Sequence, residues 1–208
     1  MSPDSAATRR AVAWVKDEPF GVEFAEVEIT KDSLRASGVA VGTAPLPYRL
    51  DYELETGSGF VMSRVRVASR GEGWHRELEL RRDADGAWSS DTFEEGEADL
   101  PRSGGDVSAF AEALDCDLGL SPVTNMMPIL RHGLQFGGGP IELTMAWIAV
   151  PTLSVEADRQ RYRHLRSAGD RHVVRYEAVD GSFVADITLD TDAVVLDYPG
   201  IARRLTER

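Results

Sequence analysis

The fold of this chain is decided by the stretch Tyr48-Arg49-Leu50-Asp51-Tyr52-Glu53-Leu54-Glu55. Every even-numbered position in it is apolar, and every odd-numbered position is charged. A period of two places all the apolar side chains on one face of an extended strand, whereas a helix would spread them around its circumference. The stretch therefore predicts a β-strand with one buried face and one face in water.

The same alternation recurs along the chain, at 74–81, 141–147, 172–176 and 183–189. Turn-forming residues lie between or after these segments, at 83–86, 180–181 and 190–192. Short strands joined by tight turns are typical of an antiparallel sheet in which consecutive strands are neighbours. We therefore expect a mainly β protein with a many-stranded antiparallel sheet, and one domain over residues 1–208.

Two segments interrupt this pattern. Within 22–29 the apolar set changes parity at Phe24-Ala25, which predicts a β-bulge or a corner of the sheet. Between Arg82 and Asp117 there are eleven acidic residues and two basic ones. Charge runs usually lie in water, so this segment predicts a solvated acidic loop, with a cation-binding surface as the alternative.

One helix is predicted, over 126–132. Asn125 can cap its start, Pro128 falls in its first turn, where a missing N–H costs nothing, and Gly133 can end it. Its side chains are apolar nearly all round the axis, which predicts that the sheet encloses it.

Composition limits the kind of protein. The formal net charge of −12 argues against a protein that binds the nucleic-acid backbone. The single cysteine, Cys116, cannot form an intramolecular disulfide and fits a reducing compartment. Neither a signal peptide nor a stretch of about 18 apolar residues is apparent, so we expect a cytoplasmic protein without a transmembrane segment. The four histidines are dispersed and no phosphate-binding glycine loop precedes a helix, so we expect neither a metal nor a cofactor.

Asp115-Cys116-Asp117 is the most distinctive short pattern. If extended, it places both carboxylates on one face and the thiol on the other, where two flanking charges raise the thiol pKa. Cys116 is therefore expected to be a buried apolar filler. The aspartates fit a structural role, such as capping or pairing with Arg131, and alternatively an acid/base pair or a site for a hard cation.

Aromatic residues fall mostly on the apolar faces of the predicted strands. Core packing is the simplest interpretation, and a cavity lined by aromatic and aliphatic side chains, suited to an amphiphile, is the alternative. The residues are Trp14, Trp74, Trp88, Trp147, Tyr48, Tyr52, Tyr162, Tyr176 and Tyr198.

Residues 115–131 resemble the central motif of the putative glycolipid-binding family, bacterial proteins of a spiral β-roll fold. The closing segment 195–200, with Asp197-Tyr198-Pro199, is similar to the family's last strand. The positions that match the central motif are Asp115, Asp117, Leu118, Pro122, Thr124, Asn125, Pro128, Ile129 and Arg131. Departures include Leu130, which replaces the first of the family's paired arginines, so only one of the pair is kept.

The resemblance implies a sheet rolled around one short helix, a homodimer, and a glycolipid or similar amphiphile as ligand. It implies no catalytic residues. The ligand-binding residues that we expect on this basis are Asp115, Asp117, Thr124, Asn125, Arg131, Gln160 and Tyr162. Two other functions remain open: a hydrolase or lyase that acts on a sugar-containing substrate through Asp115 and Asp117, and a structural or protein-interaction module.

Overall fold

Strands form where the alternating pattern predicts them. The computed structural model describes residues 7–206, and in it the deciding stretch is β4 (Tyr48–Thr56), whose apolar residues are buried. The other four alternating segments are also strands: β6 (Trp74–Arg82), β9 (Ile141–Ile148), β11 (Arg171–Ala178) and β12 (Val184–Leu189).

The fourteen strands found within residues 7–206 belong to one sheet, in the order β7-β6-β5-β4-β3-β2-β1-β14-β13-β12-β11-β10-β9-β8. Neighbours pair antiparallel except β8 and β9, which are parallel. The mainly β fold predicted from the alternation is therefore confirmed. The remaining strands are β1 (Thr8–Lys16), β2 (Gly21–Ile29), β3 (Leu34–Gly42), β5 (Met62–Gly71), β7 (Trp88–Gly96), β8 (Asp115–Leu118), β10 (Val155–Ala168), β13 (Val195–Tyr198) and β14 (Ala202–Arg204).

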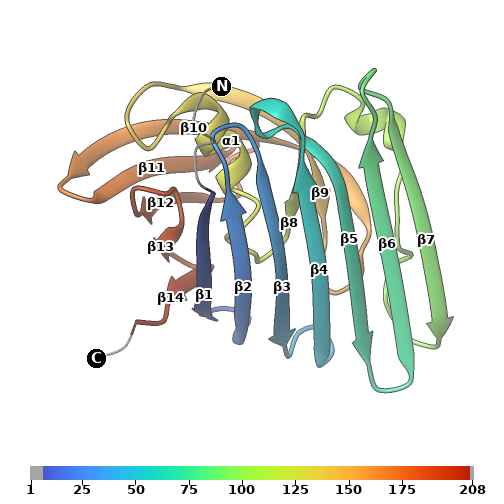
Figure 1. Ribbon diagram of the computed structural model, residues 1–208. Coiled ribbons are helices and arrows are strands. Elements are labelled where there is room, and N and C mark those ends of the chain that lie inside the picture. The colour runs from blue at the N-terminus through green and yellow to red at the C-terminus, as the bar shows by residue number, and fades with distance from the viewer. Residues whose placement is uncertain (1–6, 207–208) are drawn as a thin grey trace.

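The sheet rolls around α1 (Met126–His132), which has the bounds that the sequence predicted (Figure 1). Met126 and Met127 pack into the core formed largely by β1 to β6, whereas Ile129 packs with the core of β10 to β13. The helix thus fills the space between two parts of one sheet, which is why it is apolar nearly all round.

The β8 end of the sheet is folded back inside the roll. The backbone N–H of Met62, at the start of β5, donates to the carbonyl of Leu114 at 3.0 Å, and the indole of Trp88 donates to the carbonyl of Ala113 at 3.1 Å. Two short 3-10 helices, η1 (Ser58–Phe60) and η2 (Val107–Phe110), fill the remaining gaps. No helix within residues 7–206 is long and apolar enough to cross a membrane.

The bulge predicted at Phe24-Ala25 is wrong. β2 pairs with β1 and β3 without a break in register, with Glu23 on the inner face and Phe24 on the outer face. Glu23 is buried because Lys16 forms an ion pair with it at 2.9 Å and Tyr52 donates a hydrogen bond to it at 2.8 Å. The alternation of buried and exposed positions is therefore unbroken along β2. The apolar pattern in the sequence shifts only because a charged residue is inside and an aromatic one is outside.

The acidic segment after Arg82 is not simply a loop. Residues 88–96 form β7, which pairs along its whole length with β6. Acidic side chains such as Asp91 and Glu95 are exposed on this strand. Within the part of the chain that the structure describes, no group of three His, Cys, Asp or Glu side chains is arranged to hold a metal ion.

Candidate functional site

The motif residues around α1 form a buried hydrogen-bond network centred on Asp117. One oxygen of the Asp117 carboxylate accepts a hydrogen bond from the Thr124 hydroxyl at 2.8 Å, and the other accepts one from the Gln160 amide at 2.7 Å. Asp117 comes from β8, Thr124 from the turn before α1, and Gln160 from β10. The roll therefore brings three separate segments onto one carboxylate.

The network continues to the start of α1. The Tyr162 hydroxyl donates to Oε1 of Gln160 at 2.8 Å and accepts from Nδ2 of Asn125 at 2.9 Å. Asn125 makes no side-chain cap bond to the helix, so the predicted N-cap hydrogen bond is wrong: its amide is directed to Tyr162 instead. Oδ1 of Asn125 is buried and has no hydrogen-bond partner among the described residues.

Burial dominates the electrostatics of this network. It raises the pKa of Asp117, against the stabilising hydrogen bonds from Gln160 and Thr124, and the nearby charge of Asp158 raises it further. Burial, assisted by the Asp117 charge, also holds the pKa of Tyr162 well above its ordinary value. Tyr162 is therefore a neutral phenol at physiological pH, and its proton is available for the bond to Gln160.

Asp115 has a different partner, Arg131. Nη1 of Arg131 donates to Asp115 at 2.9 Å, and Nη2 donates to the second carboxylate oxygen. Burial raises the pKa of Asp115, although Arg131 opposes the shift. Arg131 also donates to the carbonyl of Phe60 at 3.4 Å, so this bidentate pair links α1 to β8 and η1. The structural role considered for Arg131 and Asp115 is thus observed.

Cys116 lies between the two aspartates and is fully buried. Its thiol pKa is raised well above the ordinary value by burial first and by the two carboxylates second. The thiol is therefore a poor nucleophile and packs as an apolar side chain, as the sequence predicted.

A cavity of about 750 Å³ borders the Asp117 network. Its lining includes residues of the β1–β2, β3–β4 and β11–β12 connections. Its apolar and aromatic lining consists of Pro19, Ala44, Pro45, Leu118, Gly119, Leu120, Trp147, Val150, Ala157, Tyr176, Ala178, Phe183, Tyr198 and Ile201. Its polar lining consists of Asp117, Ser121, Asn125, Glu156, Asp158, Asp180 and Ser182.

The predicted ligand-binding residues hold different positions relative to this cavity. Asp117 and Asn125 line it, whereas Thr124, Gln160 and Tyr162 bond to these two without being part of the lining. Asp115 and Arg131 are likewise outside the lining. The two aspartates are therefore not presented together to a molecule in the cavity, as an acid/base pair would require.

Sequence reasoning missed Asp158, whose carboxylate lines the cavity and accepts from the Gln160 amide at 2.8 Å. Its signal was the alternation in β10, which places Asp158 on the same face as Gln160. The aromatic wall was anticipated only as an alternative to core packing. The ring of Tyr176 lies 5.9 Å from that of Phe183 and 6.1 Å from that of Tyr198, centroid to centroid.

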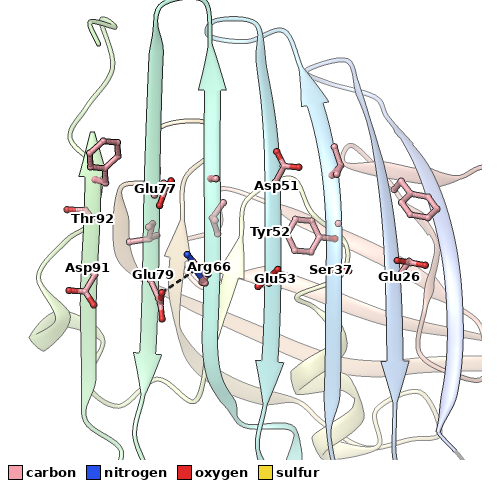
Figure 2. A pocket seen from close by; sticks show the side chains of 17 residues that line it. Glu26, Ser37, Asp51, Tyr52, Glu53, Arg66, Glu77, Glu79, Asp91 and Thr92 are labelled. Atoms are coloured by element: carbon pink, nitrogen blue, oxygen red, sulfur yellow. Dashed lines mark ion pairs between the residues drawn. The ribbon is translucent and has the colours of Figure 1, made fainter. Parts of the chain in front are cut away.

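A second depression, of about 520 Å³, lies on the outer face of β2 to β7 (Figure 2). Acidic side chains dominate it, but several are paired; Glu79, for example, contacts Arg66 at 3.3 Å. Hydrogen bonds from Arg64, above all, lower the pKa of Glu79 to about 2. The inner cavity is the stronger candidate because it combines an apolar wall with a buried polar network that has an unpaired acceptor.

A single sheet rolled around one short α-helix, with a cavity beside the buried Asp117 network, defines a protein of the β-roll class. A family model described as "Putative glycolipid-binding" matches residues 11–204. The chain belongs to this family, as the motif at 115–131 led us to expect.

The fold is shared with a solved structure. The crystal structure of a DUF1089-family protein from Pseudomonas aeruginosa is similar with a TM-score of 0.67 and 30% identity, over 88% of this chain and 92% of that chain. A β-barrel-like protein of the DUF1849 type from Brucella abortus has a TM-score of 0.47 and 7% identity, over 97% of both chains. Comparison with curated proteins found no match.

Proposed function

We propose that this protein binds a glycolipid or a similar amphiphilic small molecule in the cavity beside Asp117. The observation that carries the proposal is the composition of the lining, which combines fourteen apolar or aromatic residues with seven polar ones, Asp117 and Asn125 among them. Its volume, about 750 Å³, lies within the range usual for sites that take small molecules. An amphiphile matches such a site because its two parts need opposite surroundings.

The two parts of the ligand are assigned to different walls. The acyl or alkyl part packs against the side chains of Phe183, Tyr198 and Ile201 and their apolar neighbours. The polar part lies at Asp117 and Asn125, which the rest of the network holds in position. In this arrangement Gln160 and Tyr162 are positioning residues, and Arg131 with Asp115 fixes the helix that carries Asn125.

Filling the cavity tests the proposal. Ala178 lines the cavity from β11, so Ala178→Phe places a ring where the ligand would lie. Ala168→Phe makes the same change at an exposed position at the end of β10 and serves as the control. The delipidated proteins are titrated with octyl glucoside below its micellar concentration. We expect binding to the native protein and to the control, and loss of binding in Ala178→Phe.

A complementary measurement is native mass spectrometry of the protein purified from its own host, with extraction of any bound molecule. A stoichiometric lipid or glycolipid supports the proposal. A native protein that stays empty after incubation with host lipid extract, and that also fails to bind octyl glucoside, contradicts it.

We also propose that the protein acts in the cytoplasm, where its single cysteine would stay reduced, and, following the family resemblance, that it forms a homodimer. Support for association comes from exposed apolar side chains on the outer face: Val22 of β2 and Val41 of β3 are direct neighbours, and Phe24 lies beside Val39. Sedimentation analysis over a range of protein concentrations tests the dimer.

A further inference from the structure

We propose that the polar part of the ligand is a hydrogen-bond donor without negative charge, a hydroxyl-bearing sugar or an amine, and that the cavity discriminates against anionic headgroups. This inference rests on the proposed function and adds the chemistry of the headgroup. It is carried by the direction of the hydrogen bonds around Asn125 and by the charges of the lining.

The direction of these hydrogen bonds is set by two carboxylates. Nε2 of Gln160 donates to Asp117 at 2.7 Å and to Asp158 at 2.8 Å. A carboxylate accepts but does not donate, so the NH₂ end of the Gln160 amide must face the two aspartates. Its carbonyl oxygen, Oε1, therefore faces the opposite way and must accept.

The orientation of the Gln160 amide in turn fixes the orientation of the Tyr162 hydroxyl and of the Asn125 amide. The Tyr162 hydroxyl has a single proton, which it gives to Oε1 of Gln160. Its oxygen can then only accept, so Asn125 must present Nδ2 to it, as the 2.9 Å contact records. Rotating the Asn125 amide by half a turn would place two acceptors against each other. The remaining polar atom of Asn125, Oδ1, is thereby fixed as an acceptor.

Oδ1 of Asn125 is the atom to which we expect the ligand to donate a hydrogen bond. Asn125 lines the cavity, only 2% of the residue is exposed, and Oδ1 has no hydrogen-bond partner among the described residues. An unpaired buried acceptor costs free energy, which a donor on a bound molecule would recover. An ionised carboxylate or phosphate oxygen only accepts, so that group itself could not pair with Oδ1.

The charge of the lining points the same way. Four carboxylates line the cavity, those of Asp117, Glu156, Asp158 and Asp180, and among residues 7–206 the lining includes neither Lys nor Arg. The ammonium of Lys16 is buried and paired with Glu23 at 2.9 Å, and Ser121 of the lining donates a hydrogen bond to the same Glu23. The charge of Lys16 is thus already neutralised. An anion in the cavity would lie near several like charges with no counter-charge.

The test uses three probes with the same tail and different heads: octyl glucoside, octyl glucosaminide and octyl glucuronide. Each is titrated calorimetrically into the delipidated full-length protein below its micellar concentration. We expect the neutral and the amine-bearing probes to bind and the anionic glucuronide to bind at least about tenfold more weakly.

Two variants test the two features that we expect to disfavour an anion: the charge of the lining and the orientation of the Asn125 amide. Asp158→Asn removes one like charge while keeping the size of the side chain. Tyr162→Phe removes the hydroxyl that fixes the Asn125 amide, which can then rotate and present its NH₂ group. In both variants we expect the ratio of glucoside to glucuronide affinity to fall, which a purely structural effect would not produce.

Equal affinity for all three probes, or preference for the glucuronide, would overturn this inference and leave the proposed function intact. Binding of none of the probes by the native protein would overturn both. The comparison in the native protein is decisive even if a variant fails to fold.

Discussion

The two buried aspartates of β8 differ in how their charges are compensated. Asp115 faces a guanidinium, whereas Asp117 faces the neutral donors of Thr124 and Gln160. Burial raises the pKa of both carboxyls, so neither is fully compensated. We therefore predict how the loss of Arg131, the partner of Asp115, changes stability, and how the ionisation of Asp117 makes stability depend on pH.

Removing Arg131 should leave Asp115 buried and unpaired. We expect Arg131→Met to lower the free energy of unfolding by about 3–5 kcal/mol, the usual cost of breaking a buried ion pair. The exposed pair of Arg161 and Glu142 provides the control, since Arg161→Met should cost only about 0–1 kcal/mol. Urea denaturation measures both. Similar losses in the two variants would show that Asp115 gains little from Arg131.

Asp117 should make stability depend on pH. A raised pKa means that the native state holds the proton more tightly than the unfolded chain, so the contribution to stability is present at low pH. It is lost as the pH rises from about 3.9, the unfolded value, through the raised native pKa. The amide in Asp117→Asn does not ionise, so this variant does not lose stability as the pH rises through that range. The unfolding free energy of the variant relative to the native protein should therefore rise with pH, by at most about 1.4 kcal/mol per unit.

The control for this titration is Asp186, whose pKa is lowered, chiefly by hydrogen bonds from Arg175. Its stabilising effect is lost only as the pH falls below the ordinary carboxyl range. Denaturation curves from about pH 4 to about pH 7 should therefore show the unfolding free energy of Asp186→Asn, relative to the native protein, falling or staying constant as the pH rises. The same behaviour for Asp117→Asn, with no rise from about pH 4 upward, would contradict the assigned pKa direction.

Among the elements, α1 depends on the residue that ends it. Gly133 has φ of 61°, in the left-handed region, and its N–H donates to the carbonyl of Leu130 at 3.2 Å. The next N–H, of Leu134, donates to the carbonyl of Ile129 at 3.0 Å, which completes the C-terminal cap. The chain can thus leave the enclosed helix without leaving its last carbonyl groups unpaired.

Gly133→Ala should lower the free energy of unfolding by about 1 kcal/mol, because a Cβ is strained in this backbone conformation. Space is not the cause, since no atom lies within 4 Å of the added Cβ. Gly57 has φ of −85° and similar room, so Gly57→Ala should be neutral or slightly stabilising. Thermal unfolding of the two variants provides the comparison, and equal melting temperatures would refute the strain argument.

Local sequence signals were sufficient for elements that local physics determines. The bounds of α1 followed from Pro128 and Gly133, and the strand at 48–56 followed from its alternation. The predicted bulge in β2 failed because the burial of Glu23 depends on Lys16 of β1 and Tyr52 of β4, which the folded sheet brings to it. No property of Glu23 in the sequence distinguishes it from an exposed glutamate.

The site was predictable only in part for the same reason. The motif at 115–131 supplied Asp117 and Asn125, and the family resemblance supplied Gln160 and Tyr162. The cavity, however, is formed by connections far apart in the chain, such as 44–45 and 180–183, which come together only when the sheet rolls. Such proximity has no signature in a single sequence.

At the scale of the whole molecule, the outer face tests the proposed dimer. Phe24 is 48% exposed at the centre of the apolar group on β2 and β3. Phe24→Asp should shift the protein from dimer to monomer in sedimentation velocity runs if this face is the interface. Phe136→Asp, at a residue that is 67% exposed elsewhere, should leave the dimer unchanged. A native protein that is monomeric at every concentration would rule out the dimer.

The order of the strands in the sheet also shows which order along the chain would make all neighbouring strands consecutive in sequence. β1 pairs with β14, and Leu205 donates to the carbonyl of Ala13 at 2.7 Å, so the first and last strands meet in the middle of the sheet. A circular permutant that joins the two ends by a short linker and opens between the exposed residues Ala111 and Glu112 would make every pair of neighbouring strands consecutive in sequence. The contact between β1 and β14 would become local, so we expect the permutant to refold faster than the natural chain in stopped-flow experiments. Within residues 7–206, the pairing at the centre of the sheet joins the strands that are farthest apart in sequence, so the folding rate should depend on how fast β14 reaches β1.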